Sequence, residues 1–85
     1  MVIRFKPSFV RDFKKLSDEI QEEAFEKIER FKDDENHSKL KVHKLNGKLK
    51  NSYSFSVNYS HRIVFEYEEK NVVVFLAIGT HDIYR

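Results

Sequence analysis

The stretch that decides the fold is YSFSVNYSHRIVFEY, residues 53–67, in which the hydrophobic period is two. Its apolar positions are Tyr53, Phe55, Val57, Ile63, Phe65 and Tyr67. Such alternation predicts two β-strands, each with one buried face, joined by a turn at Tyr59 and Ser60. When the apolar residues of the two strands are paired with each other, Phe55 lies opposite Ile63. A shift of the pairing register by one residue would bury the serines instead. The stretch therefore predicts an antiparallel hairpin with one apolar and one polar face.

A third strand is predicted downstream, from Val72 to Ile78, after a turn over residues 69–71. It is apolar on both faces, as expected of a central strand, and we expect Val72, Val74 and Leu76 to join the apolar face. The opposite face then collects Ser54, Ser56, Asn58, Arg62, Val64, Phe75, Ala77 and Gly79, with His81 beyond them if the chain stays extended. One arginine among small polar residues predicts a shallow phosphate site on that face.

Upstream, the period changes from two to that of a helix. Val2–Lys6 alternates as a short strand, and Ser8 is a plausible cap of a first helix. Ser17 is predicted to cap a second, longer helix that runs to about Lys32, with its apolar stripe at Ile20, Ala24, Ile28 and Phe31. The order β-α-α-β-β-β predicts an α+β fold, with a two-helix hairpin on one face of a largely antiparallel sheet.

Length and composition restrict the class of protein. The chain has 85 residues, 40% of them hydrophobic and 35% charged, which indicates a single globular domain over residues 1–85. The absence of cysteine excludes disulfide scaffolds, thiolate zinc sites and cysteine nucleophiles. No apolar run approaches the roughly 20 residues that span a bilayer, and residues 1–9 lack the apolar core of a signal peptide. We therefore expect a cytoplasmic protein without a membrane partner.

Charge is distributed unevenly along the chain. Ten acidic and six basic residues lie between Arg11 and Glu35, whereas residues 36–65 contain no acid at all. This acid-free window holds Lys39, Lys41, Lys44, Lys48, Lys50 and Arg62, three histidines, and the aromatic residues Tyr53, Phe55 and Tyr59. Cations interleaved with aromatic rings suggest a surface for a polyanion. In the alternative interpretation, the lysines solvate a loop and the rings fill the core.

The four histidines are the remaining candidates for chemistry. The spacings of 18 and 20 residues between His43, His61 and His81 match no compact metal-ligand motif, and two glycines are too few for a phosphate-binding loop. We expect His37 to face solvent without a role. General acid–base chemistry by histidine beside a positive charge is what remains, since the pKa of histidine normally lies nearest neutral pH.

Three segments resemble the RelE/ParE toxin superfamily: HKLNG at residues 43–47, the stretch over residues 53–65, and IGTHDIYR at residues 78–85. The resemblance covers nearly the whole chain, including the order of its elements. The first two segments are shared by RelE-like ribonucleases and ParE-like gyrase poisons. The third, with His81, is more similar to YafQ-like and other RelE-type mRNA interferases, whose C-terminal histidine is catalytic.

The resemblance implies an endoribonuclease that cuts mRNA on the ribosome and needs neither a metal nor another cofactor. His43 and His81 match catalytic histidines of the YafQ-like branch, and Arg62 matches the RelE arginine that contacts the scissile phosphate. His81 is then the general acid and His43 or His61 the base. There are two departures: Val57 replaces a further histidine of that branch, and His61 stands about where it has an aspartate.

The remaining implied contacts are to RNA and to a protein. The lysines of the acid-free window, Lys39, Lys41, Lys44, Lys48 and Lys50, are expected to bind RNA backbone, together with Tyr84 and Arg85, of which Tyr84 would stack on a base. A chain that is monomeric alone is expected to bind a cognate antitoxin, whose acidic or amphipathic segment covers that window and displaces the C-terminal tail. Two alternatives stay open: a ParE-like, non-catalytic inhibitor of DNA gyrase, and an inactive binding module with the toxin fold.

Overall fold

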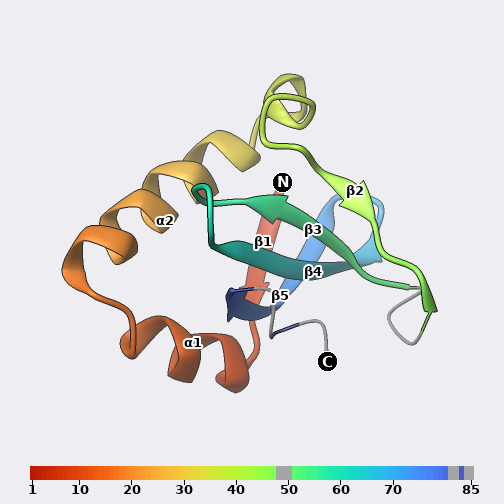
Figure 1. The fold of residues 1–85 in the computed structure, drawn as a ribbon. Coiled ribbons are helices and arrows are strands. Elements are labelled where there is room, and N and C mark those ends of the chain that lie inside the picture. The colour runs from red at the N-terminus through yellow and green to blue at the C-terminus, as the bar shows by residue number, and fades with distance from the viewer. Residues whose placement is uncertain (48–50, 81–82, 84–85) are drawn as a thin grey trace.

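The computed structural model describes residues 1–47, 51–80 and 83, which form two α-helices and a five-stranded sheet (Figure 1). The elements are β1 (Val2–Phe5), α1 (Pro7–Lys14), α2 (Asp18–Phe31), a short 3₁₀ helix η1 (Asp34–Asn36), β2 (His43–Lys44), β3 (Tyr53–Ser56), β4 (Arg62–Glu69) and β5 (Val72–Gly79). The predicted α+β class and element order are confirmed. The sequence did not predict η1 or β2, which are three and two residues long.

The strands are arranged in the order β1-β5-β4-β3-β2. The sheet is antiparallel except between its first two strands, where β1 runs parallel to β5 and Val2 lies opposite Val72. Both helices lie together on one side of the sheet (Figure 1). This arrangement leaves β1 and β2 as the two outer strands.

Phe31, at the end of α2, lies at the centre of the core. It is fully buried, and its ring stacks on Phe55 of β3 at 4.5 Å between centroids. The predicted stripe of α2 is confirmed, because Ala24 and Ile28 are buried beside it. His37 corrects an expectation. Its ring stacks on the other side of Phe31 at 4.5 Å, and its Nε2 lies 2.8 Å from the Phe31 carbonyl oxygen, so it closes the core instead of facing solvent.

The first hairpin has the predicted register, and the second does not. Phe55 lies opposite Ile63, as the alternation required. On β5, however, Val73, Phe75 and Ile78 are the buried residues, where Val72, Val74 and Leu76 were expected. A β-bulge causes the difference, since Phe65 lies opposite Phe75 while the preceding Val64 lies opposite Ala77. The inserted residue shifts the alternation of β5, so that the odd-numbered Val73 and Phe75 are buried before the bulge and the even-numbered Ile78 is buried after it.

The two predicted helix caps also have different outcomes. Ser17 caps α2, and its hydroxyl accepts a hydrogen bond from the Ile20 amide at 3.4 Å. Ser8 does not cap α1, because the helix already begins at Pro7, whose fixed φ suits a first helical position. The Ser8 hydroxyl instead donates to the Leu76 carbonyl oxygen of β5 at 2.8 Å. Within the described ranges, no helix is both long and apolar enough to cross a membrane.

Candidate functional site

The polar face of the sheet, opposite the helices, carries the candidate site in two rows of residues. One row runs across β3, β4 and β5 through Ser56, Arg62 and Gly79. The neighbouring row begins with His43 on β2 and continues through Ser54, Val64 and Ala77. The predicted polar face is therefore confirmed for these positions, while Phe75 belongs to the core.

Arg62 is held by the turn that precedes it. Its Nη1 donates to the carbonyl oxygens of Asn58 at 3.1 Å and His61 at 3.4 Å. The Nε and Nη2 donors take no hydrogen-bond or ion-pair partner from the described part of the chain, and a guanidinium has five N–H donors in all. The half-buried Arg62 is thus fixed in place with donors available to an anion.

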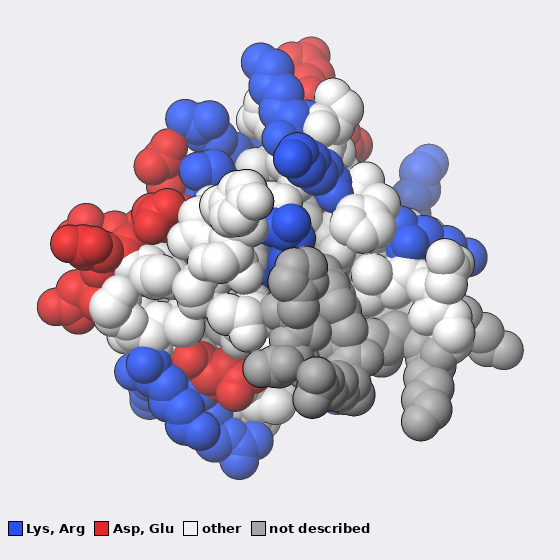
Figure 2. Space-filling view, viewed as in Figure 1, with Lys and Arg blue, Asp and Glu red and all other residues white. Residues whose placement is uncertain are grey.

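A pocket of about 500 Å³ opens over Arg62. Its described lining includes four cations and no carboxylate; the cations are Lys27, Lys39, Lys41 and Arg62. In Figure 2, acidic side chains gather along the α2 side of the molecule, whereas Lys and Arg side chains lie near its centre. The pocket is therefore electropositive, and it suits a phosphate group or a chain of phosphates.

Leu40 explains how two of these lysines reach the pocket. Its side chain is buried in the core, and its carbonyl oxygen accepts a hydrogen bond from the Ser56 amide at 2.9 Å. Both contacts fix the turn between η1 and β2 against β3. Lys39 and Lys41, the two neighbours of Leu40 in the chain, are therefore held at the pocket. Lys41 has a φ of +59°, a left-handed conformation that is unfavourable for residues with a side chain.

His43 lies on the same face, one row from Arg62. Ideal strand spacing puts their Cα atoms about 12 Å apart, close enough for both side chains to reach one phosphodiester. Nδ1 of His43 lies 2.8 Å from the Lys41 carbonyl oxygen, which can only accept, so Nδ1 carries a proton. In the neutral ring Nε2 is then the acceptor, and the Ser54 hydroxyl lies 3.4 Å from it. This tautomer presents Nε2 as a base.

His61 belongs to the turn between β3 and β4. Asn58 Oδ1 accepts hydrogen bonds from the amides of Ser60 at 2.9 Å and His61 at 2.8 Å, which makes a tight Asx turn. The same oxygen lies 3.2 Å from Nδ1 of His61, and the Ser60 hydroxyl lies 2.9 Å from that nitrogen. His61 therefore braces the turn that carries Arg62, and its Nε2 remains the acceptor of the neutral ring.

Ile83 lies against Gly79, at the end of β5. A Cβ atom at Gly79 would lie only 2.6 Å from Cγ2 of Ile83, so glycine permits the close approach of Ile83 to β5. Gly79 is also the residue opposite Arg62. The expected site residues Lys48, Lys50, His81, Tyr84 and Arg85 lie outside the described residues.

The structure separates Lys44 from the other predicted contacts and adds two residues to them. Lys44 lies opposite Tyr53, whose ring packs on the apolar side of the sheet, so it shares that side instead of the face of Arg62. Lys27 of α2 and Tyr59 line the pocket, although Lys27 was not predicted at all and Tyr59 was predicted only as one of the aromatic residues of the acid-free window. The position of Tyr59 in the acid-free window indicated that it could belong to the site, whereas nothing in the sequence pattern of α2 distinguished Lys27.

The ionisable groups on the described residues give two further facts. Burial raises the pKa of the Tyr67 hydroxyl, with smaller contributions from Tyr53 and Asp34, so this group stays protonated at neutral pH. Tyr67 contacts Tyr53 and Phe65 on the side away from Arg62. The described residues also include no cluster of three or more potential metal ligands.

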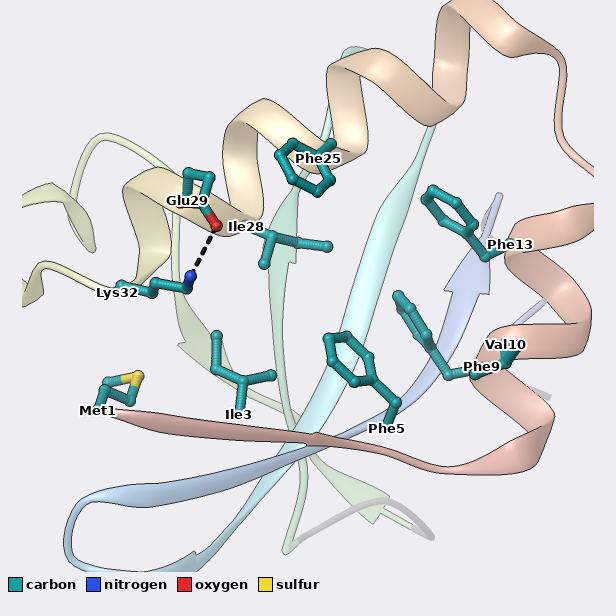
Figure 3. A pocket seen from close by; sticks show the side chains of 10 residues that line it. All are labelled: Met1, Ile3, Phe5, Phe9, Val10, Phe13, Phe25, Ile28, Glu29 and Lys32. Atoms are coloured by element: carbon teal, nitrogen blue, oxygen red, sulfur yellow. Dashed lines mark ion pairs between the residues drawn. The ribbon is translucent and has the colours of Figure 1, made fainter.

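An apolar groove lies elsewhere, between the two helices and β1 (Figure 3). Its volume is about 580 Å³, and its lining includes Ile3, Phe5, Phe9, Val10, Phe13, Phe25 and Ile28. Phe5, Val10 and Phe25 are 49%, 38% and 63% exposed, an unusual exposure for large apolar side chains. At one end, Lys32 and Glu29 form an ion pair of 2.7 Å. Contiguous apolar surface of this kind marks interaction sites.

Comparisons with known proteins identify the family of the chain and agree with its fold. Residues 3–83 match the family described as the ParE toxin of the type II toxin–antitoxin system parDE. The chain therefore belongs to the ParE toxin family, within the RelE/ParE superfamily, and is a toxin of a type II toxin–antitoxin system. No curated protein matches it in sequence.

Solved toxin structures share its fold at low sequence identity. The YoeB–YefM complex from Staphylococcus aureus is 21% identical with a TM-score of 0.74, covering 95% of this chain and 97% of that one. YafQ from E. coli is 15% identical with a TM-score of 0.72, over 96% and 94%. The toxin–antitoxin complex RelBE2 from Mycobacterium tuberculosis is 22% identical with a TM-score of 0.68, over 94% and 96%.

Proposed function

We propose that this toxin is a ribosome-dependent endoribonuclease of the cytoplasm that cleaves mRNA without a metal. The observation that carries the proposal is the braced Arg62 in an electropositive pocket, with His43 one row away on the same face of the sheet and its Nε2 available as an acceptor. The implied similarity of Arg62, His43 and His81 to RelE and YafQ residues supports the same assignment.

The reaction needs three groups. A base removes the proton of a ribose 2′-hydroxyl, whose oxygen then bonds to the adjacent phosphorus while the bond to the 5′-oxygen breaks. His43 is the base in this proposal, with His61 as the second candidate, and His81 protonates the departing 5′-oxygen. Arg62 stabilises the charge that develops on the phosphoryl oxygens, because its donors are already oriented. The products are a 2′,3′-cyclic phosphate and a 5′-hydroxyl.

We also propose that a cognate antitoxin docks in the apolar groove of Figure 3. Two of the similar structures are complexes, and one of them is described as a toxin–antitoxin complex. The groove adjoins β1, which pairs with β5 on one side and is an outer strand on the other. An extended segment can pair with such an edge while its apolar side chains fill the groove.

The experiment is to induce the toxin without an antitoxin and to map mRNA 5′ ends. We expect new ends within translated regions, strongly reduced by Arg62→Ala. Lys70→Ala is the matched control, because Lys70 lies in the turn at the opposite end of β4 and should leave the cleavage unchanged.

The second candidate is the ParE-like gyrase inhibitor, which the family match favours. DNA supercoiling by purified gyrase, measured with the purified toxin present, separates the two. Inhibited supercoiling without new 5′ ends would overturn the nuclease proposal, and neither effect would indicate an inactive binding module.

A further inference from the structure

Tyr59 is the most exposed large apolar side chain of the described residues, at 99%. Its ring stands at the tip of the turn between β3 and β4, and Tyr59 lines the same pocket as Arg62. A tyrosine in this position neither fills the core nor packs on another described ring. Its place beside the cations therefore requires another explanation.

The backbone around Tyr59 is held on both sides. Asn58 accepts hydrogen bonds from the Ser60 and His61 amides, and Val57, which is buried, donates from its amide to the His61 carbonyl oxygen at 3.0 Å. The side-chain amide of Asn58 also donates to Glu23 of α2 at 3.5 Å. A ring on a braced turn loses little conformational freedom when a ligand binds, which favours affinity.

The chemistry of the surroundings identifies the ligand. Four cations and no carboxylate among the described lining residues suit phosphates, and an exposed ring beside them suits the face of a base. Aromatic rings next to a basic groove are how proteins hold single-stranded nucleic acid, because every base has a face on which a ring can stack. A duplex hides those faces, so an unpaired strand fits better.

We infer that Tyr59 is a base-stacking platform for one nucleotide of a single-stranded RNA whose phosphates contact Lys39, Lys41 and Arg62. The inference rests on the proposed nuclease function for its choice of RNA, but it assigns a nucleobase site that the catalytic groups do not require. Lys27 lines the α2 side of the same pocket, so the strand is held from both sides.

The chain contains no tryptophan, so a Tyr59→Trp variant has a single fluorescent reporter at the platform. The probe is a single-stranded octanucleotide with 2′-deoxyribose throughout, which cannot be cleaved by attack of a 2′-hydroxyl. We expect it to quench the tryptophan fluorescence, while an octamer of abasic sites binds through its phosphates without quenching. Phe25→Trp, whose side chain lies in the apolar groove, is the control that should not respond.

Affinity provides the second measurement. Tyr59→Phe keeps the ring and should bind the octamer as the wild type does, whereas Tyr59→Ser should bind about tenfold more weakly, as expected for the loss of one stacked base. Because the side chain is exposed, both variants should have the wild-type melting temperature. Equal quenching by the abasic octamer, an unchanged affinity of Tyr59→Ser, or no binding of either octamer would overturn the inference.

The two proposals can fail separately. Quenching by the deoxyribose octamer together with no new mRNA 5′ ends in cells would retain the platform and reject the nuclease. Normal mRNA cleavage by Tyr59→Ser, together with unchanged binding, would reject the platform and retain the nuclease.

Discussion

At the scale of single residues, the proposed role of Arg62 depends on the geometry of its guanidinium as much as on its charge. Its guanidinium is planar, and one nitrogen donates to two backbone carbonyl oxygens, while the residue lines the pocket. A lysine at this position would keep the positive charge but could not bond the turn and two phosphoryl oxygens together.

We therefore expect Arg62→Lys to reduce mRNA cleavage by at least about tenfold, which corresponds to about 1.4 kcal/mol of transition-state stabilisation. A ribosome-dependent cleavage assay on purified protein measures the effect, and titration with the antitoxin should show unchanged affinity. If the variant cleaves as well as the wild type, Arg62 supplies only diffuse positive potential.

Lys41 is placed at the pocket at the expense of stability. Its left-handed backbone conformation costs a residue with a Cβ roughly 1 kcal/mol, and glycine avoids that cost. Lys41→Gly should accordingly raise the free energy of unfolding by up to about 1 kcal/mol in urea denaturation, while RNA binding weakens through the lost cation. A variant that is less stable than the wild type would show that the Lys41 side chain itself stabilises the turn.

At the scale of elements, the position of Ile83 against the end of β5 depends on Gly79. A methyl group there would contact the Ile83 side chain, so Gly79→Ala should displace Ile83, which lies two residues from the proposed general acid His81. The sheet should remain stable, because Gly79 is at the end of β5, but mRNA cleavage should fall.

The double variant Gly79→Ala/Ile83→Ala tests the cause of this effect. Alanine at residue 83 lacks Cγ2, so the space is restored and cleavage should recover relative to Gly79→Ala alone, which is a coupling between neighbours. Thermal denaturation of both variants serves as the control for folding. No recovery in a folded double variant would mean that the contact between residues 79 and 83 does not cause the loss of cleavage.

The same elements show what the sequence could predict. Alternation in β3 and β4 placed Ser54, Ser56 and Arg62 on one face, because a shift of one residue would turn these polar side chains toward the aromatic core. β5 is apolar on both faces, so its pattern contained no information about the bulge near Leu76. β2 is too short to show a period, and the turn of Lys39 and Lys41 depends on a tertiary contact of Leu40. The sequence therefore predicted where the strand residues of the candidate site lie, but not where its loop residues lie.

At the scale of the whole molecule, the apolar groove and the electropositive pocket involve different strands and share only α2, which contributes Phe25 to the groove and Lys27 to the pocket. Phe25 and Val10 belong to the groove beside β1, and Lys39 and Arg62 to the pocket over β3 and β4. An antitoxin docked in the groove and an antitoxin that covers the acid-free window can thus be told apart by substitution.

Phe25→Asp should weaken antitoxin binding by about 30-fold, since the loss of an apolar anchor costs about 2 kcal/mol. Lys39→Asp, which introduces the same side chain at the pocket and changes the net charge by two instead of one, should change the affinity by no more than a few fold. Titration calorimetry with purified antitoxin measures both. The reverse result would place the antitoxin over the acid-free window, as the charge pattern of the sequence suggested.

The parallel pairing of β1 with β5 has a consequence for the order in which the molecule is completed. Val2 pairs with Val72, which is made 70 residues later; at about 5–20 residues per second this delay is about 4–14 s. During that interval β1 has no partner strand, and Phe5 lacks the Phe75 ring that it later contacts at 5.6 Å. Arg62 likewise acquires Gly79 as a neighbour only with the last strand. A chain still in synthesis therefore has neither a complete sheet nor a complete polar face. The activity of that face can begin only after the ribosome has made β5.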